Sequence, residues 1–501
     1  MKRVGPQQME FAFAENFGKP KRELTRASDK SDEKDWLRRI ADSKEEEGPT
    51  AVGVPQHTGL LERIASRPVM ARALLNVAAN KGAAGVDGQS VEEVVKNVRP
   101  LLDKLSRALL NGEYRPGDIR RVWIPKPDGG QRGLGIPNVI DRWVQEAVRQ
   151  VLDPIFEPLF HDSSHGFRPK RGAQTAIAEA KRHIEAGHNM VVDIDISKFF
   201  DHVNHQRLLS RMSGQVKDNR VLKLVSRMLK AKVVMPDGIK ISVEEGTPQG
   251  GPLSPLLSNI VLDELDKELA RRRLRFVRYA DDCNIYVRSR RAGERVMEST
   301  RRFIEQRLRL QINEKKSSVS YPGQIHFLGF RFCRLRDGSI HVYMSNRSHE
   351  RIMQKIRELT PRTWGDSLEN CIKQINRYLT GWEAYFDLCS HPAASRWPHY
   401  DAHVRRRLRT IVVKQRKRPR FLFRHLKKRG TSKESAAMTA FSRKGIWAKG
   451  DMRGIHRAYP NVWFAERLVS VWELWKLHNL GPPVRTDPNG QLVLSFQGIT
   501  L

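Results

Sequence analysis

Two apolar segments that carry aspartates constrain the fold of this chain more than any other feature. In the first, residues 190–196 (MVVDIDI), apolar side chains alternate with Asp193 and Asp195. Successive side chains of a β-strand point to opposite faces, so Val192 and Ile194 can pack on helices while the two aspartates share the other face. The pattern predicts a strand that is buried on one side, within a mixed α+β core.

The second segment, residues 276–287 (FVRYADDCNIYV), contains two β-rich runs that meet at Asp281 and Asp282. Aspartate tolerates the backbone of a tight turn, so the segment predicts a hairpin with two carboxylates at its tip. Beside the first strand, this hairpin would bring Asp195, Asp281 and Asp282 together. Three negative charges at close range repel one another unless a cation lies between them, and carboxylate oxygens suit Mg²⁺. Taken alone, the aspartate pair is also compatible with an ordinary acidic turn.

Metal ions in such a carboxylate cluster would favour one chemistry. Two ions about 3.5–4 Å apart can stabilise both the attacking hydroxyl and the leaving pyrophosphate of a nucleotidyl transfer. The neighbouring polar residues have simpler interpretations. Asp201 has the position of a helix N-cap, and His202 and His205 lack a partner at metal-ligand spacing.

The net charge of +34 over 501 residues indicates a polyanionic partner. Lysine and arginine gain affinity for nucleic acids by releasing the counterions of phosphates, whereas a merely solvated surface needs no such excess. The charge is unevenly placed, because residues 401–450 hold 17 Lys and Arg against 2 Asp and Glu, with Phe421 and Phe441 among them. Bases stack on such rings while cations hold phosphates, so this segment predicts nucleic-acid binding.

Composition also argues against several classes of protein. No run of about 18 apolar residues occurs, so no membrane span is expected, and the first residues lack the basic-then-apolar pattern of a secretory signal. The 4 cysteines are scattered without a CxxC pair, which argues against a zinc ribbon and fits a reducing cytoplasm. We therefore expect a cytoplasmic protein.

The chain is expected to begin with a flexible extension. Residues 1–56 contain 11 Lys and Arg against 11 Asp and Glu, and their apolar residues show no sustained period. Helical patterns follow, with interruptions expected at Pro68, at Pro100 and at a Gly-rich connector in residues 82–88. Two short strands around residues 128–130 predict a further hairpin, and the last third of the chain is mostly helical in pattern.

Four motifs, in this order along the chain, resemble those of reverse transcriptases. Residues 195–201 (DISKFFD) and 246–266 (GTPQGGPLSPLLSNIVLDELD) resemble the first two palm motifs, and residues 279–282 (YADD) match the YxDD box. Residues 327–330 (FLGF) resemble the primer grip. Residues 378–386 (YLTGWEAYF) resemble a thumb or maturase region, so the pattern is most similar to the reverse transcriptase/maturase encoded by bacterial group II introns, over most of the chain.

The resemblance implies a right-hand polymerase of the α+β class, with fingers, an RRM-like antiparallel palm sheet and a thumb. In the implied order, the extension is followed by fingers and palm at 57–344, a helical thumb/maturase (X) domain at 345–430, and a basic nucleic-acid-binding region at 431–501. No CxxC pair follows residue 450, so the His-Asn-His endonuclease of many group II proteins is not expected. In this respect the chain resembles the compact group IIC type.

The resemblance also implies a set of site residues. Asp195, Asp281 and Asp282, with the carbonyl of Ile196, would bind two Mg²⁺ ions, for which Mn²⁺ could substitute. Phe200, five residues after Asp195, would be a steric gate against the ribose 2′-hydroxyl. The other residues implied to contact the nucleotide are Lys126, Arg132, Gln249 and Lys316, with Lys315 adjacent as an alternative to Lys316. Those implied to contact template or primer are Arg168, Gly250, Leu328 and Gly329.

The implied activity is RNA-directed synthesis of DNA from dNTPs, with a maturase role in group II intron splicing and retrohoming. Its partners would be intron RNA or another RNA template, a DNA primer or target, and dNTPs, and the sequence carries no signal of an oligomeric state. Three alternatives stay open: a splicing maturase or RNA chaperone without polymerase activity, a domesticated reverse transcriptase in phage defence or repair, and a viral-type RNA-templated RNA polymerase. The complete aspartate set and Gln249 argue against the first, and Phe200 and Tyr279 argue against the third.

Overall fold

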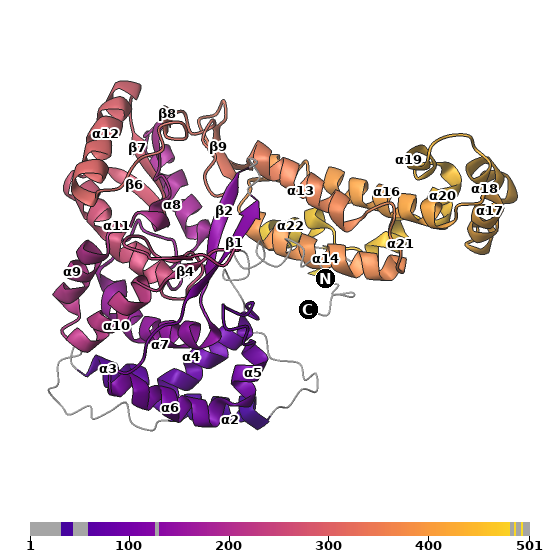
Figure 1. Ribbon diagram of the computed structural model, residues 1–501. Coiled ribbons are helices and arrows are strands. Elements are labelled where there is room, and N and C mark those ends of the chain that lie inside the picture. The colour runs from indigo at the N-terminus through magenta and orange to yellow at the C-terminus, as the bar shows by residue number, and fades with distance from the viewer. Residues whose placement is uncertain (1–31, 44–58, 126–129, 481–484, 487–491, 494–501) are drawn as a thin grey trace. The chain divides into compact units, whose positions relative to one another are not determined.

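The computed structural model describes residues 32–43, 59–125, 130–480, 485–486 and 492–493. The chain forms two compact units, Met1–Tyr321 and Pro322–Leu501. The first unit combines helices with two four-stranded sheets, and the second is largely helical (Figure 1). This mixture confirms the predicted α+β class. Within the described ranges, no helix is both long enough and apolar enough to cross a membrane.

The central sheet of the first unit carries both aspartate segments. Its strands pair in an antiparallel manner, in the order β6–β7–β3–β8. Their bounds are Arg275–Tyr279 (β6), Asp282–Val287 (β7), Met190–Asp195 (β3) and Ser318–Ser320 (β8). The predicted strand and the predicted hairpin are both confirmed, and they lie side by side.

Helices cover this sheet as the alternation in β3 predicts. Those in contact with it are α8 (Ala173–Glu185), α11 (Ser254–Arg271) and α12 (Arg290–Arg302). Through Gly293, α12 lies against the valine side chains Val192 and Val287 of the sheet. Val192 and Ile194 are fully buried. Asp193 and Asp195 alternate with them and therefore point to the other face.

A second sheet contains the hairpin that was predicted around residues 128–130. Its order is β2–β1–β4–β5, with bounds Gln131–Ile136 (β2), Ile119–Pro125 (β1), Val233–Val234 (β4) and Lys240–Ile241 (β5). β1 and β2 pair in an antiparallel manner with Ile124 opposite Arg132, which confirms the hairpin strands. The residues 126–129 that connect them lie outside the described residues.

A helical layer precedes the sheets. Its members are α3 (Leu60–Ala65), α4 (Arg67–Ala79), α5 (Val91–Lys96), α6 (Val98–Leu110) and α7 (Val139–Phe156). The indole of the fully buried Trp143 in α7 donates to the carbonyl of Met70 in α4 at 2.7 Å. The helix breaks predicted at Pro68 and Pro100 lie slightly earlier, because both prolines occupy a first helical turn, where a missing N–H costs little.

The first unit also contains two further helices and three short helical turns. They comprise α9 (His205–Gln215), α10 (Asn219–Leu229), two 3₁₀ turns, Glu157–Leu159 (η1) and Phe199–Asp201 (η2), and a π-helical turn, Phe303–Leu308 (η3). The N-cap of α9 is Asn204, whose side chain accepts from the Arg207 N–H at 3.0 Å. The assignment of Asp201 as this cap was therefore wrong, because the chain makes the η2 turn before the helix begins.

Part of the predicted flexible extension is a docked helix. Residues Asp32–Asp42 form α2, which packs on α4, and Leu37 in it is fully buried. Arg99 stacks over the Trp36 ring, and Arg72 donates to the carbonyl of Ala41 at 2.9 Å. The prediction of a flexible segment is wrong for these residues, because a short helix is stable when a neighbouring helix covers its apolar side. The rest of residues 1–56 lies outside the described residues.

The second unit begins with a hairpin and continues as helices. The hairpin strands are β9 (Phe330–Arg334) and β10 (Ile340–Met344), so the proposed boundary after residue 344 lies inside this unit. The longer helices are α13 (Asn346–Leu359), α14 (Leu368–Phe386), α16 (Pro398–Gln415), α17 (Pro419–Lys428) and α22 (Val471–Leu480). The shorter elements are α15 (His391–Ala394), α18 (Lys433–Ala440), α19 (Ile446–Lys449), α20 (Arg453–Ala458), α21 (Asn461–Ala465), β11 (Arg485–Thr486) and β12 (Leu492–Val493).

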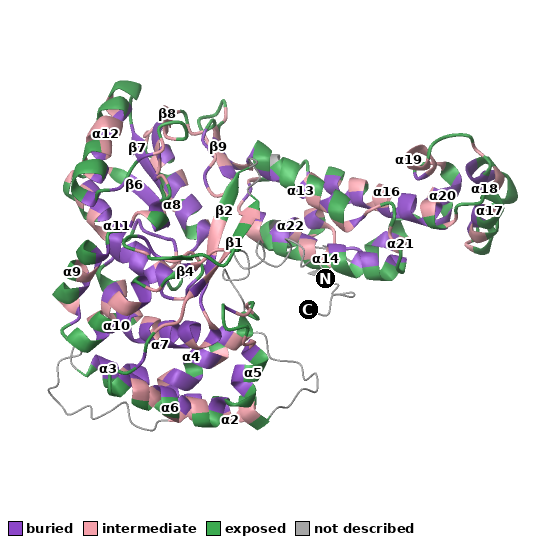
Figure 2. Cartoon of the chain, in the orientation of Figure 1, coloured by how far each residue is buried: buried purple, intermediate pink, exposed green. Residues whose placement is uncertain are grey.

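Aromatic side chains form the core of this helical unit. Trp382 of α14 packs edge-on against Trp397 and Tyr400, with ring centroids 5.0 Å and 5.7 Å away. Figure 2 shows stripes of buried residues along α14 and α16, with exposed residues on their other sides. The helical pattern predicted for this part of the chain is confirmed.

The docking of α2 predicts a stability effect. Leu37→Ala should lower the free energy of unfolding of the first unit by about 2–5 kcal/mol, the usual cost of removing a buried leucine side chain. Urea denaturation measures this loss, with Arg39→Ala on the exposed side of the same helix as the control. A Leu37→Ala midpoint equal to that of the control would show that α2 does not dock in solution.

Candidate active site

The pairing of β3 with β7 brings the predicted carboxylates together. Asp195, the last residue of β3, lies directly opposite Asp282, the first residue of β7. Tyr279 and Asp282 close the β6–β7 hairpin, whose loop consists of Ala280 and Asp281. All three predicted metal-ligating aspartates therefore lie on one strand pair and its adjoining turn.

Crowding among these carboxylates disfavours their charged forms. Burial, together with the charges of Asp281, Asp193 and Asp195, raises the pKa of Asp282 to about 7. Burial also raises the pKa of Asp281, with a contribution from Asp195. The pKa of Asp193, on the same face of β3, is raised to about 7 by burial and by Asp195. The site therefore concentrates negative charge that a cation would stabilise.

The donor atoms of this site fit a divalent metal ion. In the conformation described for residues 32–43, 59–125 and 130–480, no three His, Cys, Asp or Glu side chains converge closely enough to enclose a metal ion. The oxygens of Asp195, Asp281 and Asp282 are nevertheless hard, anionic ligands of the kind that Mg²⁺ and Mn²⁺ take. These carboxylates repel one another when no cation is bound. A bound divalent ion would offset that repulsion and draw the three side chains closer together.

The segment after η3 fixes the end of β3. Ile196 forms a bridge with Ile312, and the Asn313 N–H donates to the carbonyl of Asp195 at 2.8 Å. The Asp195 N–H donates to the hydroxyl of Ser317 at 3.1 Å. This arrangement brings Lys316 close enough to Asp282 to lower the pKa of that carboxyl.

Two of the residues predicted to contact the nucleotide are hydrogen-bonded to each other. Arg132 Nε of β2 donates to Gln249 Oε1 at 2.8 Å, and the Gly135 N–H donates to the Gln249 carbonyl at 2.8 Å. Gly250 follows with φ 129°, and a Cβ atom there would lie 2.6 Å from the Gly135 carbonyl oxygen. The charge of Arg132 lowers the pKa of Asp281, so this patch adjoins the carboxylates. Lys126 lies outside the described residues.

Phe200 lies in the η2 turn that follows β3. It is 9% exposed, and its ring packs edge-on against Phe199 with centroids 5.2 Å apart. The N–H of Thr247, which lies two residues before Gln249, donates to the Phe200 carbonyl at 2.7 Å. A backbone hydrogen bond therefore connects the η2 turn, which contains Phe200, to the loop that contains Gln249.

Arg168 occupies a structural position. It is 8% exposed, and its Nε donates to the Glu157 carboxylate at 3.1 Å. Its Nη1 donates to the carbonyls of His161 and Ser164, and its Nη2 to the carbonyl of Glu157. All of its donors bind acceptors of the protein, so Arg168 fixes the local backbone, and its contact with a template stays a prediction.

Leu328 and Gly329 form a tight turn in the second unit. Phe327 and Phe330 exchange backbone hydrogen bonds of 3.0 Å and 2.8 Å across the turn, and both turn residues have positive φ. Tyr385 of α14 donates to the Leu328 carbonyl at 2.9 Å. The predicted primer-grip residues are thus a hairpin turn that is held by the helical unit.

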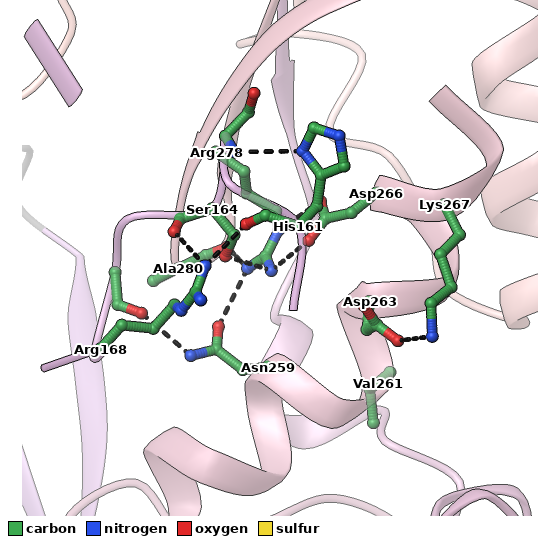
Figure 3. Close-up of polar contacts among 12 residues, drawn as sticks. His161, Ser164, Arg168, Asn259, Val261, Asp263, Asp266, Lys267, Arg278 and Ala280 are labelled. Atoms are coloured by element: carbon green, nitrogen blue, oxygen red, sulfur yellow. Dashed lines mark hydrogen bonds and ion pairs between the residues drawn. The ribbon is translucent and has the colours of Figure 1, made fainter. Parts of the chain in front are cut away.

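The sequence prediction missed a buried polar cluster behind the aspartate turn. Arg278, Asp266 and Asn259 are buried together with Ser164 and share hydrogen bonds (Figure 3). One signal was present in the sequence: Asn259 and Asp266 are seven residues apart, so they lie on the same, largely apolar side of α11.

Comparisons with known proteins agree with these motifs. Residues 124–332 match the family described as "Reverse transcriptase (RNA-dependent DNA polymerase)", and residues 349–430 match "Group II intron, maturase-specific domain". Protein YkfC of Escherichia coli (strain K12) is 32% identical in an alignment 348 residues long, which covers 61% of this chain and 91% of that protein. Group II intron-encoded protein LtrA of Lactococcus lactis subsp. cremoris is 30% identical in an alignment 338 residues long, which covers 53% of this chain and 55% of LtrA.

A more distant likeness exists to a solved structure. A chain of the "Partial Cas6-RT-Cas1--Cas2 complex" is similar over 49% of this chain and 42% of its own length, with 23% identity and a TM-score of 0.33. That likeness is too distant to support an argument. The two matched families and the near-complete coverage of YkfC place the chain: it belongs to the group II intron reverse transcriptase/maturase family, and thereby to the RNA-directed DNA polymerases.

Proposed function

We propose that this protein copies RNA into DNA by two-metal nucleotidyl transfer and also acts as a maturase in group II intron splicing and retrohoming. The observation that carries the proposal is the crowding of Asp195, Asp281 and Asp282 at the β3–β7 pair. Reverse transcriptases in general use divalent metal ions, which fits a carboxylate cluster of this kind. The coarser assignment, a reverse transcriptase with a maturase domain, rests on the family matches.

In this proposal the molecule is a right hand. The first unit would contain fingers and palm, with β6–β7–β3–β8 as the RRM-like palm sheet. The second unit would contain the thumb/maturase domain and the basic region. The antiparallel pairing of the sheet and the largely helical second unit support this assignment.

The metal ligands would be Asp195, Asp281 and Asp282 with the carbonyl of Ile196, holding two Mg²⁺ ions for which Mn²⁺ can substitute. Those ions would supply activation of the primer 3′-hydroxyl and neutralisation of the leaving pyrophosphate. The protein's own residues would position the nucleotide. Arg132 would donate to triphosphate oxygens, as charge-assisted bonds favour, and Lys316 would hold a proton near the leaving group.

Discrimination against ribonucleotides would rest on Phe200. Its carbonyl accepts from the Thr247 N–H, and its ring packs against Phe199. A ring held in that place would clash with a 2′-hydroxyl but not with the hydrogen of a deoxyribose. Gln249 and Gly250 would contact the incoming nucleotide and the template strand, and Lys126 would assist Arg132.

Intron RNA is the proposed partner of the second unit. The maturase-domain match and the intron-encoded relative LtrA support this partner. Exposed basic residues on and before α17 supply phosphate contacts; they are Lys417, Arg418, Arg420, Arg424, Lys427 and Lys428. Phe421 is 49% exposed among them and offers a ring on which a base can stack.

Removal of two metal ligands tests the polymerase directly. The double variant Asp281→Asn, Asp282→Asn should lower the rate of DNA-primer extension on an RNA template by at least about 10³-fold, since several kcal/mol of charge stabilisation are lost. Glu294→Gln is the matched control, because that carboxylate is exposed on α12 behind the sheet. An unchanged rate in the double variant would contradict the site. Tight RNA binding by a wild type that extends no primer with Mg²⁺ or Mn²⁺ would leave an RNA chaperone instead.

The gate makes a separate prediction. Phe200→Val should lower the preference for dNTPs over rNTPs, measured as the ratio of kcat/KM values, by about 10–200-fold, the range expected when a small pocket contact is removed. Phe199→Leu is the control, because Phe199 is buried beside Phe200 and should affect stability more than the ratio. Equal ratios for wild type and Phe200→Val would eliminate the gate.

The basic surface predicts a change in salt dependence. The triple variant Arg420→Ala, Arg424→Ala, Lys427→Ala should reduce the slope of log K against log salt for RNA binding by about 2, at about 0.7 per lost single-strand phosphate contact. Filter binding over a range of KCl concentrations measures this slope. Substituting Arg290, Arg291 and Arg295 on α12 with alanine removes the same charge from the first unit. Equal slopes in both triple variants would show that charge acts without a defined surface.

A further inference from the structure

The turn that carries Asp281 has an unfavourable backbone conformation. Ala280 has φ 56°, in the left-handed region that L-residues other than glycine, asparagine and aspartate rarely adopt. Such a conformation persists only where surrounding contacts determine it. The Ala280 carbonyl and the Asp281 N–H belong to one peptide plane, so whatever holds that carbonyl also sets the direction in which Asp281 leaves the turn.

Arg278 holds that carbonyl from inside the protein. It is fully buried, and its Nη1 donates to the Ala280 carbonyl at 2.9 Å and to Asn259 Oδ1 at 3.1 Å (Figure 3). Its Nε and Nη2 donate to the two carboxylate oxygens of Asp266 at 2.7 Å and 2.6 Å, and Nη2 also donates to Ser164 Oγ at 2.7 Å. A guanidinium has five N–H groups in one plane, and each of them has an acceptor here. The side chain is therefore fixed in position and orientation.

The other side of the turn is closed by the segment that contains Gly166. This segment pairs with β6, since the Arg278 N–H donates to the Ser163 carbonyl and the His165 N–H donates to the Arg278 carbonyl, both at 2.8 Å. A Cβ atom on Gly166 would lie 2.3 Å from the Ala280 nitrogen, so the segment touches the turn directly. Asn259 Nδ2 donates to the Gly166 carbonyl at 2.9 Å and thereby joins both sides.

A buried ion pair is a poor means of adding stability. Apolar residues of similar volume often replace such a pair without loss, because desolvation of two charges offsets their attraction. A bidentate pair with further hydrogen bonds does supply a fixed direction. The Arg278–Asp266 pair, with both side chains 0% exposed, is therefore better explained by orientation than by stability.

We propose that Arg278, held by its bidentate pair with Asp266 and by Asn259, is a positioning residue that fixes the Ala280–Asp281 peptide and so aims the Asp281 carboxylate at the metal site. This inference rests on the proposed polymerase function. Arg278 is fully buried behind the turn and is bonded to the Ala280 carbonyl, so it would act through Asp281 and not on substrate or metal directly.

The test removes both buried charges together. The double variant Arg278→Met, Asp266→Leu leaves no buried charge without a partner and approximately conserves volume, so the protein should fold. Its single-turnover rate of nucleotide addition should fall about 10²-fold, the effect of displacing a catalytic group by about 1 Å. Its affinity for primer–template, measured by fluorescence anisotropy, should change less than about twofold, because the basic surface is untouched. Mn²⁺ binding, followed by the EPR signal of the free ion, should weaken by about tenfold. The loss of affinity is smaller than the loss of rate because only one of the proposed metal ligands is displaced.

Two further variants separate position from charge and from folding. Arg278→Lys keeps the charge but cannot bind Asp266 in a bidentate manner and also reach Ala280, so it should not rescue the rate. Ser164→Ala removes one acceptor of the same guanidinium and spares the bond to the turn, so it should keep the wild-type rate within about threefold, the loss of about one hydrogen bond. Thermal melting establishes that each variant is folded, and if the double variant does not fold, Arg278→Lys carries the test.

The outcomes are distinct. A folded double variant, or a folded Arg278→Lys, with wild-type rate and wild-type Mn²⁺ binding would overturn the proposal. If the wild type binds Mn²⁺ but extends no primer, the polymerase function fails, and the Mn²⁺ affinities alone decide whether Arg278 positions Asp281. If the wild type neither binds Mn²⁺ nor extends a primer, both proposals are overturned.

Discussion

The antiparallel register of β3 and β7 is the constraint on which the rest of the site depends. Side chains in a strand alternate with a period of two, so a slip of one residue would turn Asp195 into the core and bring Ile194 or Ile196 to the site. The register is protected on one face by apolar packing, since Val192 and Ile194 are fully buried. At its open end it is held by the Asn313 and Ser317 contacts to Asp195. Packing on one face thus determines the chemistry on the other.

The aspartates at the β3–β7 pair form a local cluster of negative charge in a chain whose net charge is +34. Around the carboxylates, Arg132, Lys316 and Arg278 lower the pKa of one or another of them, yet burial and mutual repulsion prevail. In the proposed function, this balance would let the site accept a divalent cation while the basic residues around it bind phosphates. Neither property requires a special fold, and both follow from where a small number of charges lie relative to the solvent.

The elements with a strong period were predictable from the sequence, and those fixed by tertiary contact were not. The alternation in residues 190–196 and the β-rich runs around Asp281 predicted the strand and the hairpin correctly. The α2 helix was missed because its few apolar residues gain their burial from α4, which a local pattern does not reveal. The burial of Arg168 and Arg278 was also not predictable, because an arginine in the sequence does not reveal whether its side chain is bonded inside the protein.

The ties between the β1–β2 hairpin and the Gln249 loop have a mechanical consequence. The side chain and the carbonyl of Gln249 are bonded to Arg132 and Gly135, and Gly250 leaves no space between its own backbone and that of Gly135. These contacts should make the β1–β2 hairpin and the Gln249 loop move together. A displacement of strand β2 would displace Gln249 as well, and through the Thr247–Phe200 hydrogen bond it would also act on the turn that carries Phe200. In the proposed function, contact with the base, binding of the triphosphate and exclusion of ribonucleotides would then be coupled through these hydrogen bonds.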